Sequence, residues 1–356
     1  MLLQAVVFAV VSALAAPVTL RADDSAASIA AGGLMPRRET RIVMAKEVLR
    51  ISDKKVIVDY DFRNDTDQDV TTEVAFPVPP YQNFWQQLSL ATESFSDFQL
   101  QIDGKPVSFQ VEASATLNEK DVTAILGADK IDIASFGHFE ELPTGDIRTA
   151  DLERLPKSEQ ERLTALGLFG TDPPIAKWTV HLQYHWTQTF PAHSTVHIRH
   201  EYTPAGGYTQ MPSSLKFFKA ALLPANQRKD DPLLKGSLDL LDSFCADASF
   251  VNGMMNAEMA DTSQEKMIYP HWVDFILTSA NTWQRPIEDF TLILERPTTA
   301  GRRTLISFCA PQNGKVEKPD ADHFQVHLAN FVPAAELHIG FFDLPEAKAA
   351  QPAAKK

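Results

Sequence analysis

The feature that most constrains the fold is a regular alternation of apolar and polar side chains between Lys177 and Thr187. A period of two places every second side chain on one face of an extended strand, whereas a helix would spread them around its axis. The run therefore predicts a β-strand that covers a hydrophobic core with one face. Its apolar positions are Trp178, Val180, Leu182, Tyr184 and Trp186.

Shorter runs with the same period occur elsewhere in the chain. Residues 56–62 alternate in this way, and residues 70–76 are expected to form the strand that returns from them across the turn-like sequence 64–67. Residues 196–202 are expected to be the antiparallel neighbour of the 178–186 strand. Further strands are expected at residues 273–279, 290–295, 304–309, 324–328 and 337–342.

A second hairpin is indicated by Asp103-Gly104, which lies between the alternating runs 98–102 and 107–111. Asp-Gly is favoured in two-residue hairpin turns because both residues tolerate positive φ angles. We therefore expect these two runs to pair.

Three segments have helical rather than strand periodicity. Residues 118–128 are expected to form a helix capped by Asn118, and residues 157–169 a second one. We interpret residues 115–172 as a helical insertion between two strand-rich parts. A third helix is expected at residues 231–244, with Asp231 as its cap and Pro232 at its first position.

About ten half-buried strands and few helices predict a mainly β protein, built from antiparallel sheets packed as in a β-sandwich. The expected organisation is a single unit over residues 23–344. Its expected parts are a signal peptide (1–22), an N-terminal β-rich part (23–114), the helical insertion (115–172), a C-terminal β-rich part (173–344) and a disordered tail (345–356).

The N-terminus resembles a secretory signal peptide. An apolar run from Leu2 to Val11 is followed by small residues, and cleavage is expected between Ala22 and Asp23. A second cleavage sequence lies at residues 13–15. The alternative is an uncleaved anchor helix, because residues 2–20 approach the length of about 20 residues that crosses a bilayer. The interpretation we favour is a periplasmic or secreted protein with no stable membrane span after signal removal.

The formal net charge of −13 argues against several classes of partner. An acidic surface repels phosphate backbones, and no block of clustered Lys or Arg offsets it. Nucleic acids and anionic membranes are therefore poor partners, and solubility is sufficient to explain the acidity.

The chain contains two cysteines, Cys245 and Cys309. In an oxidising compartment, an even and low count indicates one disulfide. The alternatives are two free buried thiols or a redox pair, although the C-x-x-C spacing typical of redox pairs is absent.

The histidines give little support for a metal site. His181 and His185 have a spacing that binds zinc on a helix, but four residues along a strand span about 13 Å, too far for one ion. A metal site formed by His193, His197 and His200 would need a β-bulge, because His197 and His200 lie on opposite faces of the expected strand. We predict no metal and no cofactor.

One acid–base hypothesis uses His271 with Asp274 or Asp289, as in a hydrolase of the cell envelope. Nothing in the sequence brings these residues together, and no G-x-S-x-G nucleophile motif is present. We assign no catalytic residue, and an enzyme is the less favoured interpretation.

Aromatic residues on strands support a different hypothesis, in which their rings stack on a sugar or line an apolar groove. Core packing is the simpler explanation for tryptophans at period two. The proline-rich segment 76–84 resembles an exposed loop that could contact a partner, although a rigid connection explains it equally well. The aromatic residues considered are Trp85, Trp178, Trp186, Trp272, Trp283, Tyr81, Phe84, Tyr184 and Tyr269.

The chain also resembles a family of exported bacterial proteins known as domain of unknown function 4424. The resemblance implies export and a single unit over about residues 23–345, and it makes the pairing of Cys245 with Cys309 a family feature. It implies no reaction. The matching stretches are residues 31–34, 44–79, 178–207, 277–294, 308–309 and 330–333.

These observations favour an exported, β-rich binding or assembly module without catalysis, whose ligand or envelope partner is unknown. The envelope hydrolase is the alternative.

Overall fold

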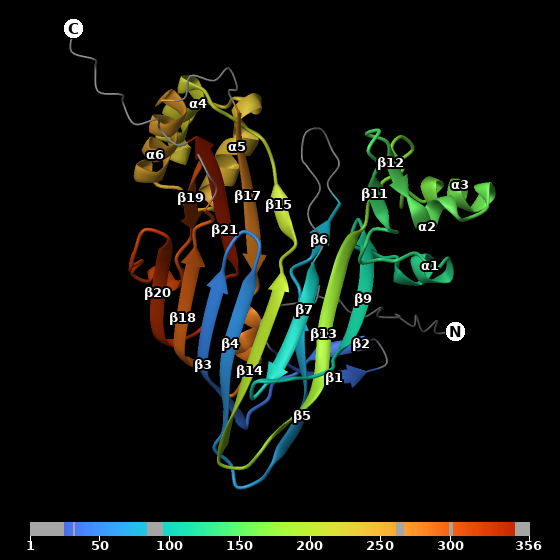
Figure 1. Ribbon diagram of the computed structural model, residues 1–356, viewed down its shortest axis with the longest axis vertical. Coiled ribbons are helices and arrows are strands. Elements are labelled where there is room, and N and C mark those ends of the chain that lie inside the picture. Colours follow the sequence, from blue (N-terminus) through green and yellow to red (C-terminus); the bar gives the residue numbers. More distant parts are fainter. Residues whose placement is uncertain (1–24, 31–32, 84–94, 261–266, 299–301, 346–356) are drawn as a thin grey trace, which may run out of the picture.

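The computed structural model describes residues 25–30, 33–83, 95–260, 267–298 and 302–345 (Figure 1). Strands hold 44% of the residues and helices 21%, so the expected mainly β fold with antiparallel sheets and helical segments is confirmed. The proposed signal peptide with its cleavage point at Ala22 and Asp23 lies outside the described residues, as does the tail from residue 346 onward. Within the described part, no helix is both long and apolar enough to cross a bilayer.

The first sheet has seven strands and contains both N-terminal and C-terminal segments. Neighbouring strands are antiparallel except β18 and β3, which are parallel. The strand order is β20 (His323–Phe331), β18 (Ile287–Glu295), β3 (Ile42–Ile51), β4 (Val56–Asn64), β14 (Ser194–Thr203), β7 (Ser96–Ile102) and β8 (Lys105–Pro106).

The second sheet faces the first and is centred on the long alternating strand that the sequence predicts. This strand, β13 (Thr179–Phe190), pairs with β5 on one side and with β9 on the other. The strand order is β10 (Lys120–Asp121), β9 (Gln110–Leu117), β13, β5 (Val70–Pro77), β1 (Ser25–Ala30) and β2 (Gly33–Pro36), with β6 (Tyr81–Gln82) added beside β13.

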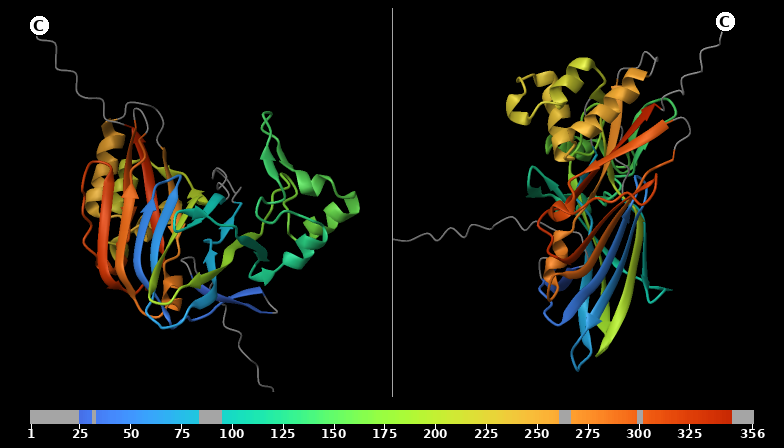
Figure 2. Two further views of the ribbon diagram at one scale, coloured as in Figure 1. Left: turned by 60° about the horizontal axis from the view of Figure 1, so that its bottom comes forward. Right: turned by 90° about the vertical axis from the view of Figure 1, so that its left-hand side faces the viewer.

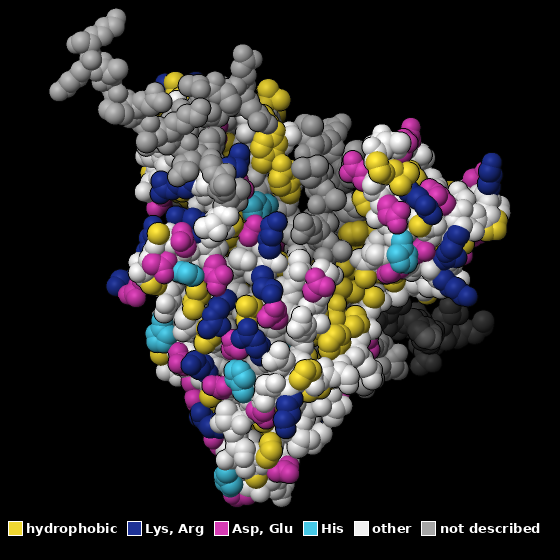
Figure 3. Space-filling view, in the orientation of Figure 1, with side chains coloured by type: hydrophobic (Ala, Val, Ile, Leu, Met, Phe, Trp, Pro, Cys, Tyr) yellow, Lys and Arg dark blue, Asp and Glu magenta, His cyan; other side chains and the backbone are white. Residues whose placement is uncertain are grey.

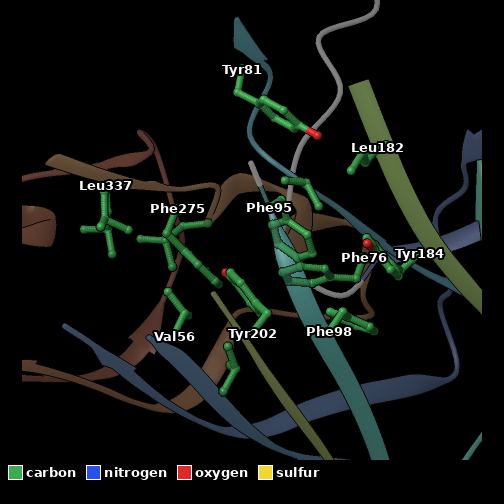
Figure 4. Packing of buried hydrophobic residues seen from close by; sticks show 14 of the residues in the cluster. Val56, Phe76, Tyr81, Phe95, Phe98, Leu182, Tyr184, Tyr202, Phe275 and Leu337 are labelled. Atoms are coloured by element: carbon green, nitrogen blue, oxygen red, sulfur yellow. The ribbon is translucent and has the colours of Figure 1, made fainter. Parts of the chain in front are cut away.

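The main core lies between these two sheets and is rich in aromatic rings (Figure 4). Phe98 of the first sheet packs on Tyr184 of the second with ring centroids 4.2 Å apart. Phe62 and Phe190 make a similar contact across the sandwich, at 5.8 Å. Burial of these rings is the main stabilising contribution that holds the sheets together.

Two connections differ from the sequence expectation, because they cross between sheets instead of forming hairpins. β4 leads to β5, and β13 leads to β14, but each pair is divided between the facing sheets. The prediction that residues 196–202 pair beside 178–186 is therefore wrong. The strand expected at residues 70–76 is present as β5, but it pairs with β13 and β1 and not with β4. The buried Asn64 links the β4–β5 connection to the end of β13, since its side-chain amide donates to the carbonyl oxygens of Gln68 and Phe190, both at 2.9 Å.

The hairpin at Asp103-Gly104 is present, and both residues have positive φ. Its second strand is shorter than expected, because β8 ends at Pro106. The amide of Val107 still donates to the carbonyl of Leu100 at 3.0 Å, and the chain then crosses to the second sheet as β9, which pairs with β13.

The helical insertion lies between β9 and β13, which are neighbours in the second sheet. Asn118 does not cap its first helix as expected. Asn118 lies in a turn with positive φ, and Asp121 accepts from the amide of Thr123 instead. The insertion contains α1 (Thr123–Ala128), β11 (Phe139–Glu141), β12 (Ile147–Thr149), α2 (Ala150–Glu153) and α3 (Lys157–Ala165).

A third sheet extends the structure on the side away from the insertion, and both of its faces are covered. One face joins the main core through Val273 and Phe341, and the other packs against three helices through Ile268 and Phe342. Figure 2 shows these helices together on one side of the sheet. The strand order is β15 (Gly206–Tyr208), β17 (Met267–Phe275), β21 (Leu337–Pro345) and β19 (Arg302–Phe308), with β16 (Met211–Pro212) beside β17.

Of the three helices, the sequence predicts one. This is α5 (Pro232–Ser243), and its expected cap is present, since Asp231 accepts from the amide of Leu233. The other two are α4 (Leu215–Ala221) and α6 (Ala248–Ala260). Short 3-10 turns occur at Ala225–Gln227, Thr278–Thr282 and Pro311–Asn313.

Candidate functional site

Successive side chains of β17 alternate between the main core and the helices. Val273 lies in the main core, whereas Trp272 packs with the helical cluster. His271 therefore lies on the core-side face of the third sheet, and Asp274 lies on the helix-side face. One strand thus contributes polar groups to two separate surfaces.

Two tyrosines lie together on the core-side face near its solvent-exposed end. Tyr208 of β15 is directly opposite His271 in register, and Tyr269 is two residues before His271 on β17. The tyrosine rings are nearly parallel, with centroids 6.0 Å apart and an interplanar angle of 11°. Both are half-buried, so part of each ring is accessible to a ligand.

A glycine is required beside this pair. A Cβ atom added to Gly207 would lie 1.9 Å from the Trp272 ring, which packs against the backbone of β15. Because nothing larger than hydrogen fits there, Gly207 lets β15 lie close to β17 and places Tyr208 next to Tyr269.

His271 adds a hydrogen-bonding group beside the tyrosines. Its ring stacks on the fully buried Phe341, with centroids 5.4 Å apart and an angle of 8°. Its Nε2 lies 3.6 Å from a carboxylate oxygen of Asp53, in the turn between β3 and β4. That distance is too long for a hydrogen bond, and this Nε2 is buried and makes none to the residues that the structure describes. A ligand can therefore reach this pair only through the exposed parts of the two side chains, 23% of His271 and 15% of Asp53.

We call Tyr208, Tyr269, His271, Phe341 and Asp53 the aromatic face. Figure 3 shows a band of hydrophobic side chains over β15 and β16, continuing toward the helices. Chemically, the aromatic face combines two accessible ring surfaces with a carboxylate and an imidazole. Such a set can stack against an apolar or planar group and hydrogen-bond its polar edge.

The residues of the hydrolase hypothesis are not brought together. Asp274 lies on the opposite face of β17 from His271, where it bonds Nδ1 of His338 at 2.5 Å. Asp289 lies in the first sheet, where it bonds His327 at 2.8 Å. Both named combinations are therefore wrong. His271 and Asp274 are an odd number of residues apart on one strand, which places their side chains on opposite faces, and Asp289 belongs to another sheet.

The remaining histidines are dispersed over the sandwich. His181 bonds the hydroxyl of Thr116 at 2.9 Å, and burial lowers its pKa. His185 bonds Glu73 at 2.7 Å and is buried rather than exposed. His200 lies in the core, while His193 and His197 lie at the surface beside carboxylates. Among the described residues, no group of three or more potential ligands is arranged to hold a metal ion.

Most of the aromatic residues singled out in the sequence are core residues. Trp178, Trp186 and Trp283 are buried, and so is Tyr81 in the proline-rich segment. That segment is therefore not an exposed loop over residues 76–83, while Phe84 and Trp85 lie outside the described residues. Of the tyrosine pair, the sequence indicated Tyr269 but not Tyr208, because β15 is too short to show a period.

A family model described as domain of unknown function DUF4424 matches residues 22–339. No curated protein matches the chain in sequence. Among solved structures, a Legionella pneumophila protein described as a "putative nutrient binding protein" is 16% identical with a TM-score of 0.38, covering 90% of this chain and 70% of that one.

An M1 zinc metallopeptidase from Deinococcus radiodurans is 8% identical with a TM-score of 0.21, covering 86% of this chain and 43% of that one. The chain therefore aligns with less than half of the peptidase. TM-scores this low do not indicate a shared fold.

Proposed function

The chain belongs to the DUF4424 family, and from that premise we propose that it is an exported, non-catalytic binding module whose ligand contacts the aromatic face. The observation that carries this proposal is the parallel pair of half-buried tyrosines next to the His271–Asp53 pair. In binding sites, aromatic rings supply contact area at low entropic cost, and a few polar groups fix the orientation of the ligand.

Export and a periplasmic or secreted location are supported by two features. The N-terminal sequence has the layout of a signal peptide, and the two cysteines are joined by a disulfide. Disulfides persist in oxidising compartments and are rare in the cytosol. The organisation into parts at residues 114–115 and 172–173 remains a prediction, although each of the first two sheets contains strands from both β-rich parts.

The chemistry of the aromatic face favours a ligand without net negative charge. The protein has a formal net charge of −13, and Asp53 lies at the site itself, so an anionic ligand would be repelled. A saccharide or an aromatic amino acid has a surface that stacks on tyrosine and polar edges that reach the imidazole and the carboxylate.

The test is a saturation-transfer NMR screen of neutral mono- and disaccharides and aromatic amino acids against the mature chain. We expect at least one probe to bind. Tyr208→Ala and Tyr269→Ala should each weaken its binding by about tenfold, the order of magnitude of one lost stacking contact of 1–1.5 kcal/mol.

Leu233→Ala is the matched control, because Leu233 lies on α5 with 86% of its surface exposed. It should leave the dissociation constant unchanged. Absence of binding by every probe, or equal binding by wild type and both tyrosine variants, would show that the aromatic face is not the binding site.

A further inference from the structure

The disulfide lies at the surface of the third sheet. Cys245 and Cys309 are bonded with their Cα atoms 5.1 Å apart, and both residues are exposed. Cys245 follows the C-terminal end of α5, and Cys309 follows the last residue of β19. A reductant in solvent can therefore reach this bond, unlike one buried in a core.

The strand register places a histidine beside Cys309. The ladder between β19 and β21 ends with Phe308 opposite Ile339. Extending that register by one residue on each strand brings Cys309 opposite His338. Directly opposite residues share one face of a sheet and have Cβ atoms about 5 Å apart. Cys309 and His338 therefore lie next to each other on the helix-side face.

The same register continues to a carboxylate. His338 is opposite Asp274 in the ladder between β21 and β17, and its Nδ1 is 2.5 Å from the Asp274 Oδ1. Sulfur, imidazole and carboxylate thus lie in one row across three adjacent strands. In this order, a carboxylate orients a histidine, and the histidine stabilises a thiolate.

The position of His338 is fixed by the residue that precedes Cys245. Phe244 stacks on the His338 ring with centroids 4.3 Å apart and an angle of 15°. The Phe244 carbonyl accepts from the hydroxyl of Ser307 at 2.9 Å. A Cβ atom on Gly340 would lie 2.9 Å from the Phe244 ring, so a glycine is needed for this packing.

The two sulfurs have different surroundings. The amides of Cys245 and Ala246 donate to the carbonyls of Asp242 and Leu241, which close the C-terminus of α5. Cys245 has a φ of 52° at the position where such helix ends usually have glycine. The carbonyl of Ser243, at the C-terminal end of α5, lies 3.5 Å from the Cys309 sulfur, so the negative end of the helix dipole disfavours a thiolate on either cysteine. Only Cys309 has a histidine as its neighbour in the strand register, and an imidazole favours the thiolate there.

We propose that this disulfide is a site of thiol–disulfide exchange with a protein dithiol, and that Cys309 is its leaving group. A thiolate of the dithiol attacks the Cys245 sulfur, the Cys245–Cys309 bond breaks, and its electron pair stays on Cys309. His338, oriented by Asp274, stabilises and protonates that thiolate. The second thiol of the reductant then attacks the mixed disulfide and expels Cys245. Two electrons and two protons pass to the cysteine pair, and the reductant becomes a disulfide.

The test begins with wild-type mature protein, reduced with dithiothreitol as the dithiol probe and then alkylated with iodoacetamide at neutral pH. Peptide mass spectrometry follows each cysteine over time. We expect Cys309 to be alkylated on the order of tenfold faster than Cys245, because alkylation follows the thiolate fraction. Equal rates, or a faster Cys245, would overturn the proposal without any variant.

The second measurement compares His338→Gln with the control His327→Gln. His327 also bonds an aspartate, Asp289, but it lies in the first sheet. His338→Gln should bring the two alkylation rates together and slow reduction by dithiothreitol, while His327→Gln should change neither. Asp274→Asn should give an intermediate loss, because Asp274 is a positioning residue. If His338→Gln left both rates at wild-type values, a merely structural bridge would be indicated.

Discussion

Replacing His200 with leucine tests how the sandwich core responds to acid. His200 is fully buried, and four aromatic rings lie within 5.0–5.6 Å of it, those of Tyr60, Phe76, Phe98 and Trp186. Burial in this apolar environment lowers its pKa from 6.5 to about 3, an effect that Asp59 opposes only in part. The imidazole is therefore neutral in the folded protein at any pH near neutrality.

The direction in which pH changes the stability follows from proton binding. Between pH 6.5 and 3 the unfolded chain protonates His200 and the folded chain does not, so the folded state becomes less stable as the pH falls through this range. With a folded pKa of about 3, the loss relative to pH 7 is about 2 kcal/mol at pH 5 and about 3 kcal/mol at pH 4. Above pH 6.5 the contribution is fully present.

His200→Leu removes this titration, and leucine is close to histidine in volume, so the core can keep its packing. The free energy of unfolding is measured by urea denaturation at pH 7 and at pH 5. Its decrease from pH 7 to pH 5 should be about 2 kcal/mol smaller in His200→Leu than in wild type. His193→Gln is the control, since His193 lies at the surface. If wild type and His200→Leu lost the same free energy between the two pH values, the argument from burial would be refuted.

Three further outcomes are expected. Gly340→Ala should destabilise by about 1–3 kcal/mol in urea denaturation, because its Cβ would lie 2.9 Å from the Phe244 ring, whereas Gly127→Ala, with nothing within 4 Å, should not. Asn64→Ala should cost about 1–3 kcal/mol by the same assay, since it removes the donor to the buried carbonyl of Phe190 and the acceptor of the Thr66 amide; a loss under 0.5 kcal/mol would contradict this. Cys245→Ala should lose about 4 kcal/mol for a closed loop of 64 residues, seen as a lower melting temperature with ligand affinity unchanged.

The sequence determined the local structure wherever a period or a cap identified it. The alternation around Trp178 to Trp186 became β13, and Asp231 with Pro232 began α5 as expected. The presence of two cysteines indicated the disulfide. These features depend on neighbours within a few residues, so a single chain shows them directly.

The placement of His271 and Asp274 on opposite faces follows from the sequence alone. His271 and Asp274 are an odd number of residues apart in a run that forms β17, and this alone places them on opposite faces. The contacts of His271 with Asp53 and of Asp274 with His338 could not be predicted from the sequence, because these partners are far away in the chain.

Tertiary structure alone decided which strands pair. The turns after Asn64 and Phe190 look like hairpin turns, yet both carry the chain to the opposite sheet. In a sandwich, either arrangement buries the same alternating apolar residues, so the local pattern does not distinguish them. The choice is made by contacts between distant segments, such as Phe62 with Phe190 and the parallel pairing of β3 with β18. Contacts of the same kind, such as Phe275 with Phe76, pack β17 against the sandwich, and the turn at Asp53 lies beside His271 of that strand in the aromatic face.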